Sequence, residues 1–143
     1  MNRIELIKAA FDLNNPEQYS HYSDDFQYSD ELGSPSQDKD TWTAAGQPFR
    51  SAFPDLSLVV EDVQEEGDGI VVTSRYFGTF TNDLDLSAVG LGIVPATGKD
   101  YVAPAGTTLV SFDNGKISKM HGLDTRPDAG VPGILRMLGV NMG

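Results

Sequence analysis

Residues 111–124, SFDNGKISKMHGLD, decide the fold class of this chain. The pair Asn114-Gly115 stands between two runs rich in apolar and β-branched residues, Tyr101–Asp113 and Lys116–Asp124. Asn-Gly in that setting is a strong signal for a β-hairpin, because both residues accept the positive φ that the tightest hairpin turn requires. The stretch therefore predicts two antiparallel strands joined by a tight turn.

Two further strands are expected upstream of this hairpin. Ile70–Thr81 is long and rich in β-branched and aromatic residues, and Leu56–Val63 alternates between apolar and polar residues. The acidic, Gly-containing segment Glu65–Gly69 between them predicts a turn. Asp83–Thr97 carries aliphatic residues without alternation, so we expect an excursion there that is not a strand.

The first third of the chain reads mainly as helix. Apolar residues recur at helical spacing over residues 1–13, and Pro16 opens a second short helix that reaches Tyr22. A strand is expected at Asp25–Asp30, and a longer helix is expected from about Lys39 to Phe53.

The start and the course of the longer helix depend on a few polar and helix-breaking residues. Asp38 or Asp40 could cap its first turn. Gly46 and Pro48 are unfavourable inside a helix, so we expect it to be kinked or split. A last short helix is expected at residues 134–138.

Composition and element order favour one ordinary globular domain. The 143 residues are 39% hydrophobic and 22% charged, and we expect a single domain over residues 1–143. Helices come first and antiparallel strands follow, which is the α+β pattern. The formal net charge of -11 makes nucleic acid and membrane surfaces poor partners.

The residue types and motifs that the chain lacks exclude several kinds of catalytic and metal-binding site. The chain has no cysteine, which rules out disulfides, thiolate metal sites and a cysteine nucleophile, and suits a reducing cytoplasm. Its two histidines lack the spacing of a zinc site, and there is no Gly-x-Ser-x-Gly nucleophile motif. The first residues carry charges at helical spacing rather than a signal-peptide core, so a cytoplasmic location is expected.

An ordered set of short motifs resembles the SnoaL-like polyketide cyclases, within the larger fold superfamily of nuclear transport factor two and the ketosteroid isomerases. The resemblance is good over roughly residues 50–140 and extends to the first 50 only by element order. The motifs are Phe53-Pro54-Asp55-Leu56, Tyr76–Thr81, Gly92–Lys99, Phe112–Ile117 and Ile134–Gly139.

The resemblance implies a cone of strongly curved, mainly antiparallel sheet, with helices that close its mouth around an internal pocket. It also implies an intramolecular aldol ring closure that uses an acidic residue and no cofactor, although relatives catalyse other reactions or none known. Two functions follow as hypotheses. One is a cofactor-independent cyclase or isomerase that acts on a small apolar carbonyl compound, and the other is a non-catalytic module that binds a small apolar or aromatic ligand.

The resemblance assigns the acid/base role to Asp124, near the end of the last strand. Asp124 is seven residues beyond Ile117, where the family usually has eight, so simple alternation puts the two side chains on opposite faces, and a bulge at Gly122 could restore the direction. His121, expected on the face of Ile117 and Lys119, is the second catalytic candidate, because histidine titrates near neutrality. The alternatives are a structural histidine, and an Asp124 that caps the turn before Pro127 or pairs with Arg126.

Other residues are candidates for substrate binding. Asp30 lies in a strand where the family often carries an acid, although it could be a solvated loop charge. Arg75 and Tyr28 could orient or polarise a carbonyl substrate, and Arg75 could equally face outward at a dimer interface. Trp42 and Phe77 belong to a set of aromatics that could wall a cavity or simply form the core.

The pattern of apolar residues in the predicted strands bears on whether the protein forms an oligomer. The predicted strands carry apolar residues on both faces, and an apolar outer face needs a cover. We therefore expect a homodimer that pairs through the outer face of the sheet.

Overall fold

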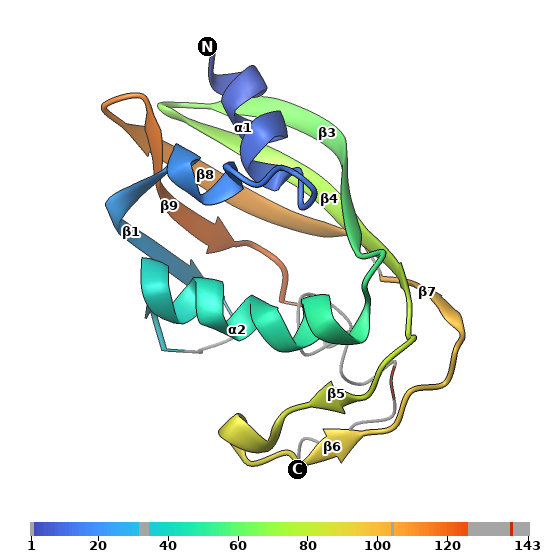
Figure 1. The fold of residues 1–143 in the computed structure, drawn as a ribbon. Coiled ribbons are helices and arrows are strands. Elements are labelled where there is room, and N and C mark those ends of the chain that lie inside the picture. Colours follow the sequence, from blue (N-terminus) through green and yellow to red (C-terminus); the bar gives the residue numbers. More distant parts are fainter. Residues whose placement is uncertain (1, 32–34, 104, 126–137, 139–143) are drawn as a thin grey trace.

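The computed structural model of the chain describes residues 2–31, 35–103, 105–125 and 138. Most of the strands follow the helices along the chain, as the sequence predicts, although the first two strands precede the longest helix (Figure 1). The elements are α1 Arg3–Phe11, η1 Gln18–His21, β1 Tyr22–Asp30, β2 Gln37–Asp38, α2 Lys39–Ala52, β3 Ser57–Glu66, β4 Gly69–Thr79, β5 Leu84–Asp85, η2 Ser87–Val89, β6 Ile93–Val94, β7 Asp100–Val102, β8 Gly106–Asp113 and β9 Lys116–Gly122.

One curved sheet organises the molecule. Its strand order is β2-β1-β9-β8-β4-β3, with β7 attached to β4, and the sheet is not closed into a barrel. Among the pairings that the described residues form in this sheet, β1–β9 alone is parallel, which confirms an α+β fold with a mainly antiparallel sheet. The segments α1, η1 and α2 lie on one side of the sheet, and β5 and β6 lie on the side of α2 away from α1 (Figure 1).

The hairpin predicted at residues 101–124 forms, with one change. Asn114 and Gly115 take φ values of 52° and 76°, as the tight turn requires. The predicted strand at 101–113 is wrong as one element, because it is divided into β7 and β8. The division spans Pro104, which has no amide hydrogen to donate to a strand partner.

The helices begin where polar caps allow. Asn2 and Glu5 form a capping box at the start of α1, and Asp38 caps α2 by accepting a hydrogen bond from Thr41 N at 2.8 Å. The expected split of α2 is wrong, because α2 is assigned as one helix from Lys39 to Ala52 with Pro48 inside it. The helix predicted at 134–138 lies almost wholly outside the described residues.

A hydrophobic core fills the space between the sheet and the N-terminal helices. We call the sheet face that carries Ile70, Val72 and Val110 the inner face, because these buried side chains pack against α1, and we call the opposite face the outer face. The core cluster consists of Leu6, Ile7, Ala10, Phe11, Tyr22, Phe26, Ile70, Val72, Val110, Ile117 and Met120.

A second, smaller core lies around the end of α2. Leu84 and Leu86 of the Gly-rich excursion are buried against Ala52, Phe53 and Phe80. In this segment β5 and β6 pair with each other. The expectation of no strand between Asp83 and Thr97 is therefore wrong, because two short strands form there.

A bulge in β9 decides which residues face the core. Phe112 pairs with Ile117 but Ser111 pairs with Lys119, so Ser118 is an extra residue in β9. Ile117 and Met120 consequently share the inner face, and both are buried. The expectation that His121 shares a face with Ile117 is therefore wrong, and the bulge lies at Ser118 rather than at Gly122.

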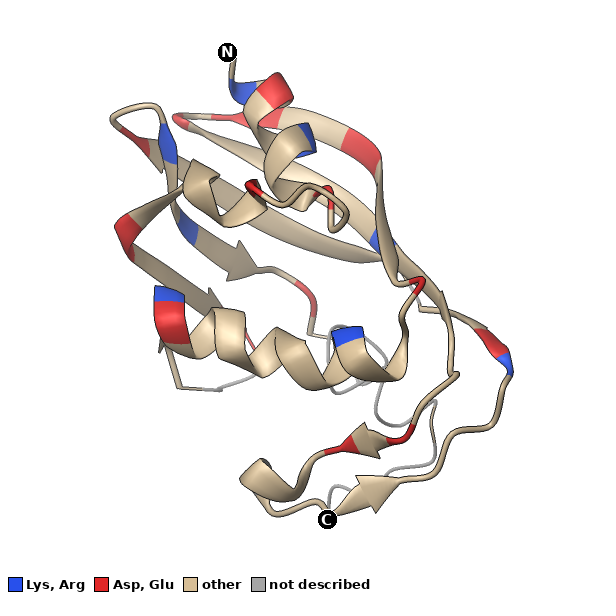
Figure 2. Cartoon of the chain, in the orientation of Figure 1, with Lys and Arg blue, Asp and Glu red and all other residues tan. Residues whose placement is uncertain are grey.

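The acidic residues are distributed over the molecule. Asp and Glu lie mainly at strand ends and turns rather than in one patch (Figure 2). Within the described part of the chain, no helix has the length and apolar character needed to cross a membrane.

Candidate functional site

Small residues form part of the inner face at the start of β8 and the end of β9. Ser74 pairs with Gly106, and Thr108 pairs with Gly122, so these four residues lie side by side in the sheet. All four lie on the inner face, because they keep the alternation set by Val72, Val110 and Met120. Larger side chains cover the other end of this face, whereas the glycines at this end let side chains of other segments approach the sheet closely.

Two carboxylates and a phenol surround this floor. A Cβ built on Gly122 would lie 3.4 Å from the Tyr28 hydroxyl and 3.3 Å from Asp30 Cβ. A Cβ built on Gly106 would lie 3.4 Å from Asp124 Oδ2. Tyr28, Asp30 and Asp124 therefore meet over the floor, although they come from β1 and from the segment after β9.

The Asp124 carboxylate is held by β8. Its Oδ2 accepts a hydrogen bond from Thr107 N at 2.7 Å, and its Oδ1 accepts one from Thr107 Oγ1 at 3.1 Å. Asp124 is half-buried. Two hydrogen bonds to one residue fix the direction of this carboxylate.

The environment of Tyr28 keeps its phenol protonated. Burial raises the pKa of Tyr28 to about 12, and the nearby Asp30 and Asp124 carboxylates act in the same direction. The hydroxyl is consequently a hydrogen-bond donor across the neutral pH range, and it can donate to a carbonyl or enolate oxygen.

Aromatic rings form one wall beside this group. The Trp42 ring from α2 stacks on Tyr28 at 6.4 Å between centroids and lies 5.0 Å from Phe26. Tyr22 and Tyr19 contact the same indole at 5.1 Å and 6.1 Å. This cluster combines core residues with the partly exposed edge of Trp42 and Tyr28.

Tyr76 of β4 completes the arrangement. It lies on the inner face opposite Leu58, and 36% of its surface is accessible to solvent. Surrounding protein nevertheless raises the pKa of the Tyr76 phenol by desolvation. We use "the recess" for the part of the inner face bounded by Tyr28, Trp42, Tyr76, Asp124 and the small-residue floor.

The opposite side of the sheet holds His121. Its register partners are Leu109 of β8 and Ser29 of β1, which alternate with the inner residues Val110 and Tyr28. His121 Nδ1 is 2.6 Å from Ser29 Oγ, and Nε2 is 2.9 Å from Glu31 Oε1. His121 thus joins β1 to β9 on the outer face, away from Asp124.

Arg75 and Phe77 also lie on the outer face, because they alternate with Tyr76 along β4. Arg75 Nε donates to Glu61 Oε1 at 3.3 Å. Of the residues singled out from the sequence, the structure brings together Tyr28, Asp30, Trp42 and Asp124, and it separates His121, Arg75 and Phe77 from them.

Sequence reasoning missed Tyr76 and Arg50. The sequence does not single out Tyr76, because the pattern of one strand does not show toward which other elements a curved sheet turns its side chains. Arg50 had a usable signal, since it is two helical turns beyond Trp42 and therefore on the same side of α2. Among the described residues, no three His, Asp or Glu side chains gather to hold a metal ion.

Comparison with known proteins supports the fold. A SnoaL-like polyketide cyclase candidate from Jannaschia sp. CCS1 is 21% identical, with a TM-score of 0.65 over 83% of this chain and 82% of that one. AclR, a hydroxylase candidate from Streptomyces galilaeus, is 20% identical, with a TM-score of 0.69 over 95% and 91%. IdmH, a polyketide cyclase candidate from Streptomyces antibioticus, is 18% identical, with a TM-score of 0.65 over 85% and 91%.

A match to a protein-family model agrees with this structural likeness. No curated protein matches the chain. The family model of the SnoaL-like domain matches residues 9–120, which is most of the chain and stops just before His121 and Asp124. This protein therefore belongs to the SnoaL-like domain family.

Proposed function

We propose that this protein is a cofactor-independent enzyme of the cyclase or isomerase type, which moves a proton next to the carbonyl group of a small apolar ligand. Asp124 is the acid/base residue, and Tyr28 stabilises the negative charge that develops on the carbonyl oxygen. One observation carries the proposal: Asp124, Asp30 and the Tyr28 hydroxyl converge over a floor of small residues on the inner face.

Asp124 suits the role of a base because its direction is fixed. Thr107 holds both carboxylate oxygens, so the group does not have to be ordered when a substrate binds. Proton abstraction needs a base within hydrogen-bond reach of the reacting carbon, and a fixed carboxylate beside an open floor can provide that reach.

Tyr28 suits the role of an oxyanion donor. Its phenol stays protonated far above neutral pH, and it stacks on Trp42, which restricts its movement. A donor that is already oriented toward the developing charge stabilises an enolate without reorganisation. Asp30 lies beside Tyr28 and is the second carboxylate of the site.

The same contacts leave a second candidate function. The two hydrogen bonds from Thr107 are also what a structural cap would make, and this favours a non-catalytic module that binds a small aromatic ligand between Trp42 and Tyr76. The two functions differ in chemistry but share the recess and the class of ligand.

Proton exchange on a simple ketone separates the two candidates without the natural substrate. We expect the protein to accelerate exchange of the hydrogens next to the carbonyl of 2-tetralone in D2O, measured by NMR, because Asp124 removes a proton and Tyr28 stabilises the enolate. Tyr28→Phe should bind the ketone and exchange it more slowly. Binding of 2-tetralone with exchange no faster than in buffer would favour the binding module.

The proposal includes a homodimer that forms through the outer face. Val59 and Val102 are 46% and 50% exposed there, beside the half-buried Phe77. An apolar sheet face of this kind gains free energy when a second copy covers it. We expect light scattering at micromolar protein to give twice the mass of one chain, and Val102→Glu to shift the mass toward one chain. A wild-type mass of one chain would contradict the dimer.

The proposal further includes a cytoplasmic location and no cofactor. The complete absence of cysteine is compatible with a reducing compartment. Acid/base chemistry on a carbonyl compound needs only the carboxylate and the phenol named above.

A further inference from the structure

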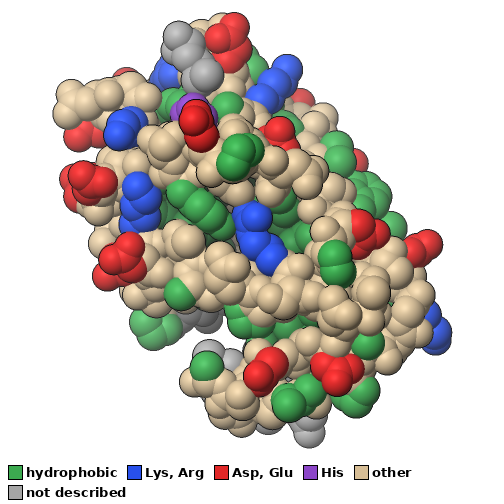
Figure 3. Space-filling model, viewed as in Figure 1, with side chains coloured by type: hydrophobic (Ala, Val, Ile, Leu, Met, Phe, Trp, Pro, Cys, Tyr) green, Lys and Arg blue, Asp and Glu red, His purple; other side chains and the backbone are tan. Residues whose placement is uncertain are grey.

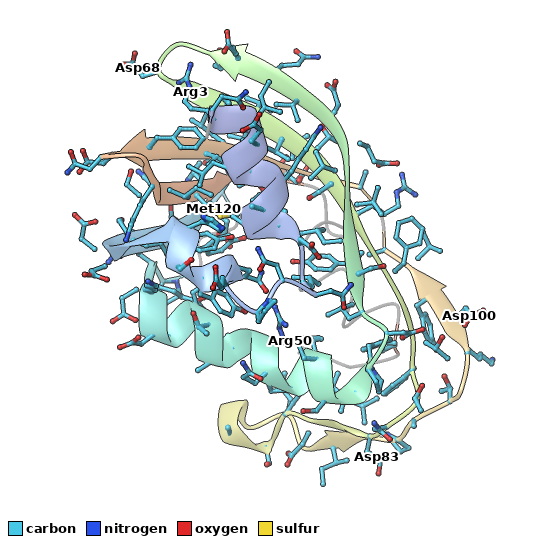
Figure 4. The ribbon with its side chains drawn as sticks, turned by 45° about the horizontal axis from the view of Figure 1, so that its top comes forward. Arg3, Arg50, Asp68, Asp83, Asp100 and Met120 are labelled. Atoms are coloured by element: carbon cyan, nitrogen blue, oxygen red, sulfur yellow. The ribbon has the colours of Figure 1, made fainter. Side chains whose placement is uncertain are left out.

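Arg50 is a half-buried cation that the proposed reaction does not use. It leaves α2 toward η1 and the end of α1 (Figure 4). Its NH1 donates to Leu13 O at 3.2 Å, and its NH2 donates to Gln18 Oε1 at 2.5 Å and to Tyr19 OH at 3.1 Å. The guanidinium also lies over the Tyr19 ring, 5.6 Å from its centroid.

All three of these acceptors are neutral. The described ion pairs of Arg and Lys join Arg3, Lys39 and Arg75 to carboxylates, and none of the described carboxylates lies within ion-pair distance of Arg50. A chain of net charge -11 offers many carboxylates for a structural pair. No described carboxylate therefore neutralises this partly desolvated guanidinium, and its positive charge is available to pair with an anion.

The position of Arg50 connects this charge to the recess. Tyr19 makes the connection, because its hydroxyl accepts a hydrogen bond from Arg50 and its ring lies 6.1 Å from the ring of Trp42, which bounds the recess. In the same region, Arg50 lowers and Tyr19 raises the pKa of Tyr76. The Tyr76 hydroxyl makes no hydrogen bond to any described residue, and the proton of Tyr19 OH is free to be donated. On the face drawn in Figure 3, basic side chains lie beside apolar ones near the middle of the molecule.

Arg50 also has donors to spare. A guanidinium carries five N–H groups, and the three hydrogen bonds above use three of them. The remaining N–H groups and the two phenol hydroxyls are donors of the kind that bind a carboxylate with charge-assisted hydrogen bonds.

We propose that Arg50, with the hydroxyls of Tyr19 and Tyr76, binds the carboxylate of a small aromatic ligand in the recess. The inference rests on the proposed function and adds the class of substrate, an aromatic carboxylate. The recess then has two ends of opposite charge, with Asp30 and Asp124 at one end and Arg50 at the other. A carboxylate is repelled by the first end and attracted by the second, which orients the ligand with its carbonyl carbon toward Asp124.

A pair of probes that differ only in charge tests this. Calorimetry should give 2-naphthoate an affinity at least about tenfold higher than that of its neutral amide, 2-naphthamide, since one charge-assisted hydrogen bond contributes about that much. Arg50→Met should remove the preference for the carboxylate and leave the affinity for the amide nearly unchanged. The matched control is Arg75→Met, the same change on the outer face, which should keep the full preference.

The possible outcomes test the role of Arg50, the preference for a carboxylate and the recess separately. Equal affinity of the wild-type protein for the two probes overturns the inference and leaves the proposed function standing. A preference that survives Arg50→Met also overturns it, and binding of neither probe removes the aromatic-ligand recess as well. If Arg50→Met does not fold, Arg50→Lys decides: a shorter point charge should weaken the preference several-fold, and an unchanged preference overturns the role of Arg50.

Discussion

Asp124→Asn should slow the exchange of 2-tetralone hydrogens by about two orders of magnitude or more, because the amide has no basic oxygen to accept a proton. Asn has the shape of Asp, and its oxygen can still accept the hydrogen bond from Thr107 N. The affinity for 2-tetralone should therefore change little. Since Tyr28 titrates only at about pH 12, the pH dependence of exchange near neutrality should reflect groups other than this phenol.

His121→Gln is the matched comparison in the same assay. Like Asp124→Asn, this change replaces a titratable side chain by an amide. His121, however, lies in β9 with its side chain on the outer face beside Ser29 and Glu31. We expect exchange close to that of the wild-type protein. If His121→Gln abolishes exchange and Asp124→Asn does not, the assignment of the two faces to function is wrong. A large loss of stability in Asp124→Asn would instead support a structural cap.

Phe26→Ala should lower the free energy of unfolding by about 3–5 kcal/mol, as deletions of buried aromatic side chains do. Phe26 is fully buried, and its ring lies 5.0 Å from both Tyr22 and Trp42. The deletion would leave a cavity beneath the aromatic wall of the recess, where β1, η1 and α2 meet.

Urea unfolding measures this effect, with Ile4→Ala as the control. Ile4 is 40% exposed in α1, and alanine is a good helix former, so the control should change stability by less than about 1 kcal/mol. A melting temperature lower by about 10 °C is expected for Phe26→Ala. Equal, small effects of the two changes would show that the aromatic cluster does not hold these elements together.

Local sequence signals predicted the elements well, because each depends on a few neighbouring residues. The turn at Asn114-Gly115 follows from the backbone freedom of those two residues. The cap at Asp38 follows from a side-chain oxygen within reach of Thr41 N. Pro48 shows the limit of such rules, since α2 continues past it to Ala52 although proline lacks the amide hydrogen for a helical hydrogen bond.

The faces of the last strand could not be predicted in the same way. One extra residue at Ser118 reverses the direction of every side chain that follows, and nothing local marks Ser118 as a bulge. His121 consequently faces the side opposite to the one that simple alternation gives it, and Asp124 lies beyond the end of β9, where its Oδ2 approaches Gly106. The meeting of Tyr28 with Tyr76 is a property of the sheet's curvature, because three strand pairings separate β1 from β4.

The central claim is that the inner recess, and not the outer face, binds the substrate. A crystal structure with 2-tetralone bound tests it most directly. The account predicts the ketone between Trp42 and Tyr76, with its oxygen within hydrogen-bond reach of the Tyr28 hydroxyl and the adjacent carbon about 3–3.5 Å from an Asp124 oxygen. A ketone bound on the outer face beside His121 and Arg75, or one in the recess that Asp124 does not reach, would contradict it.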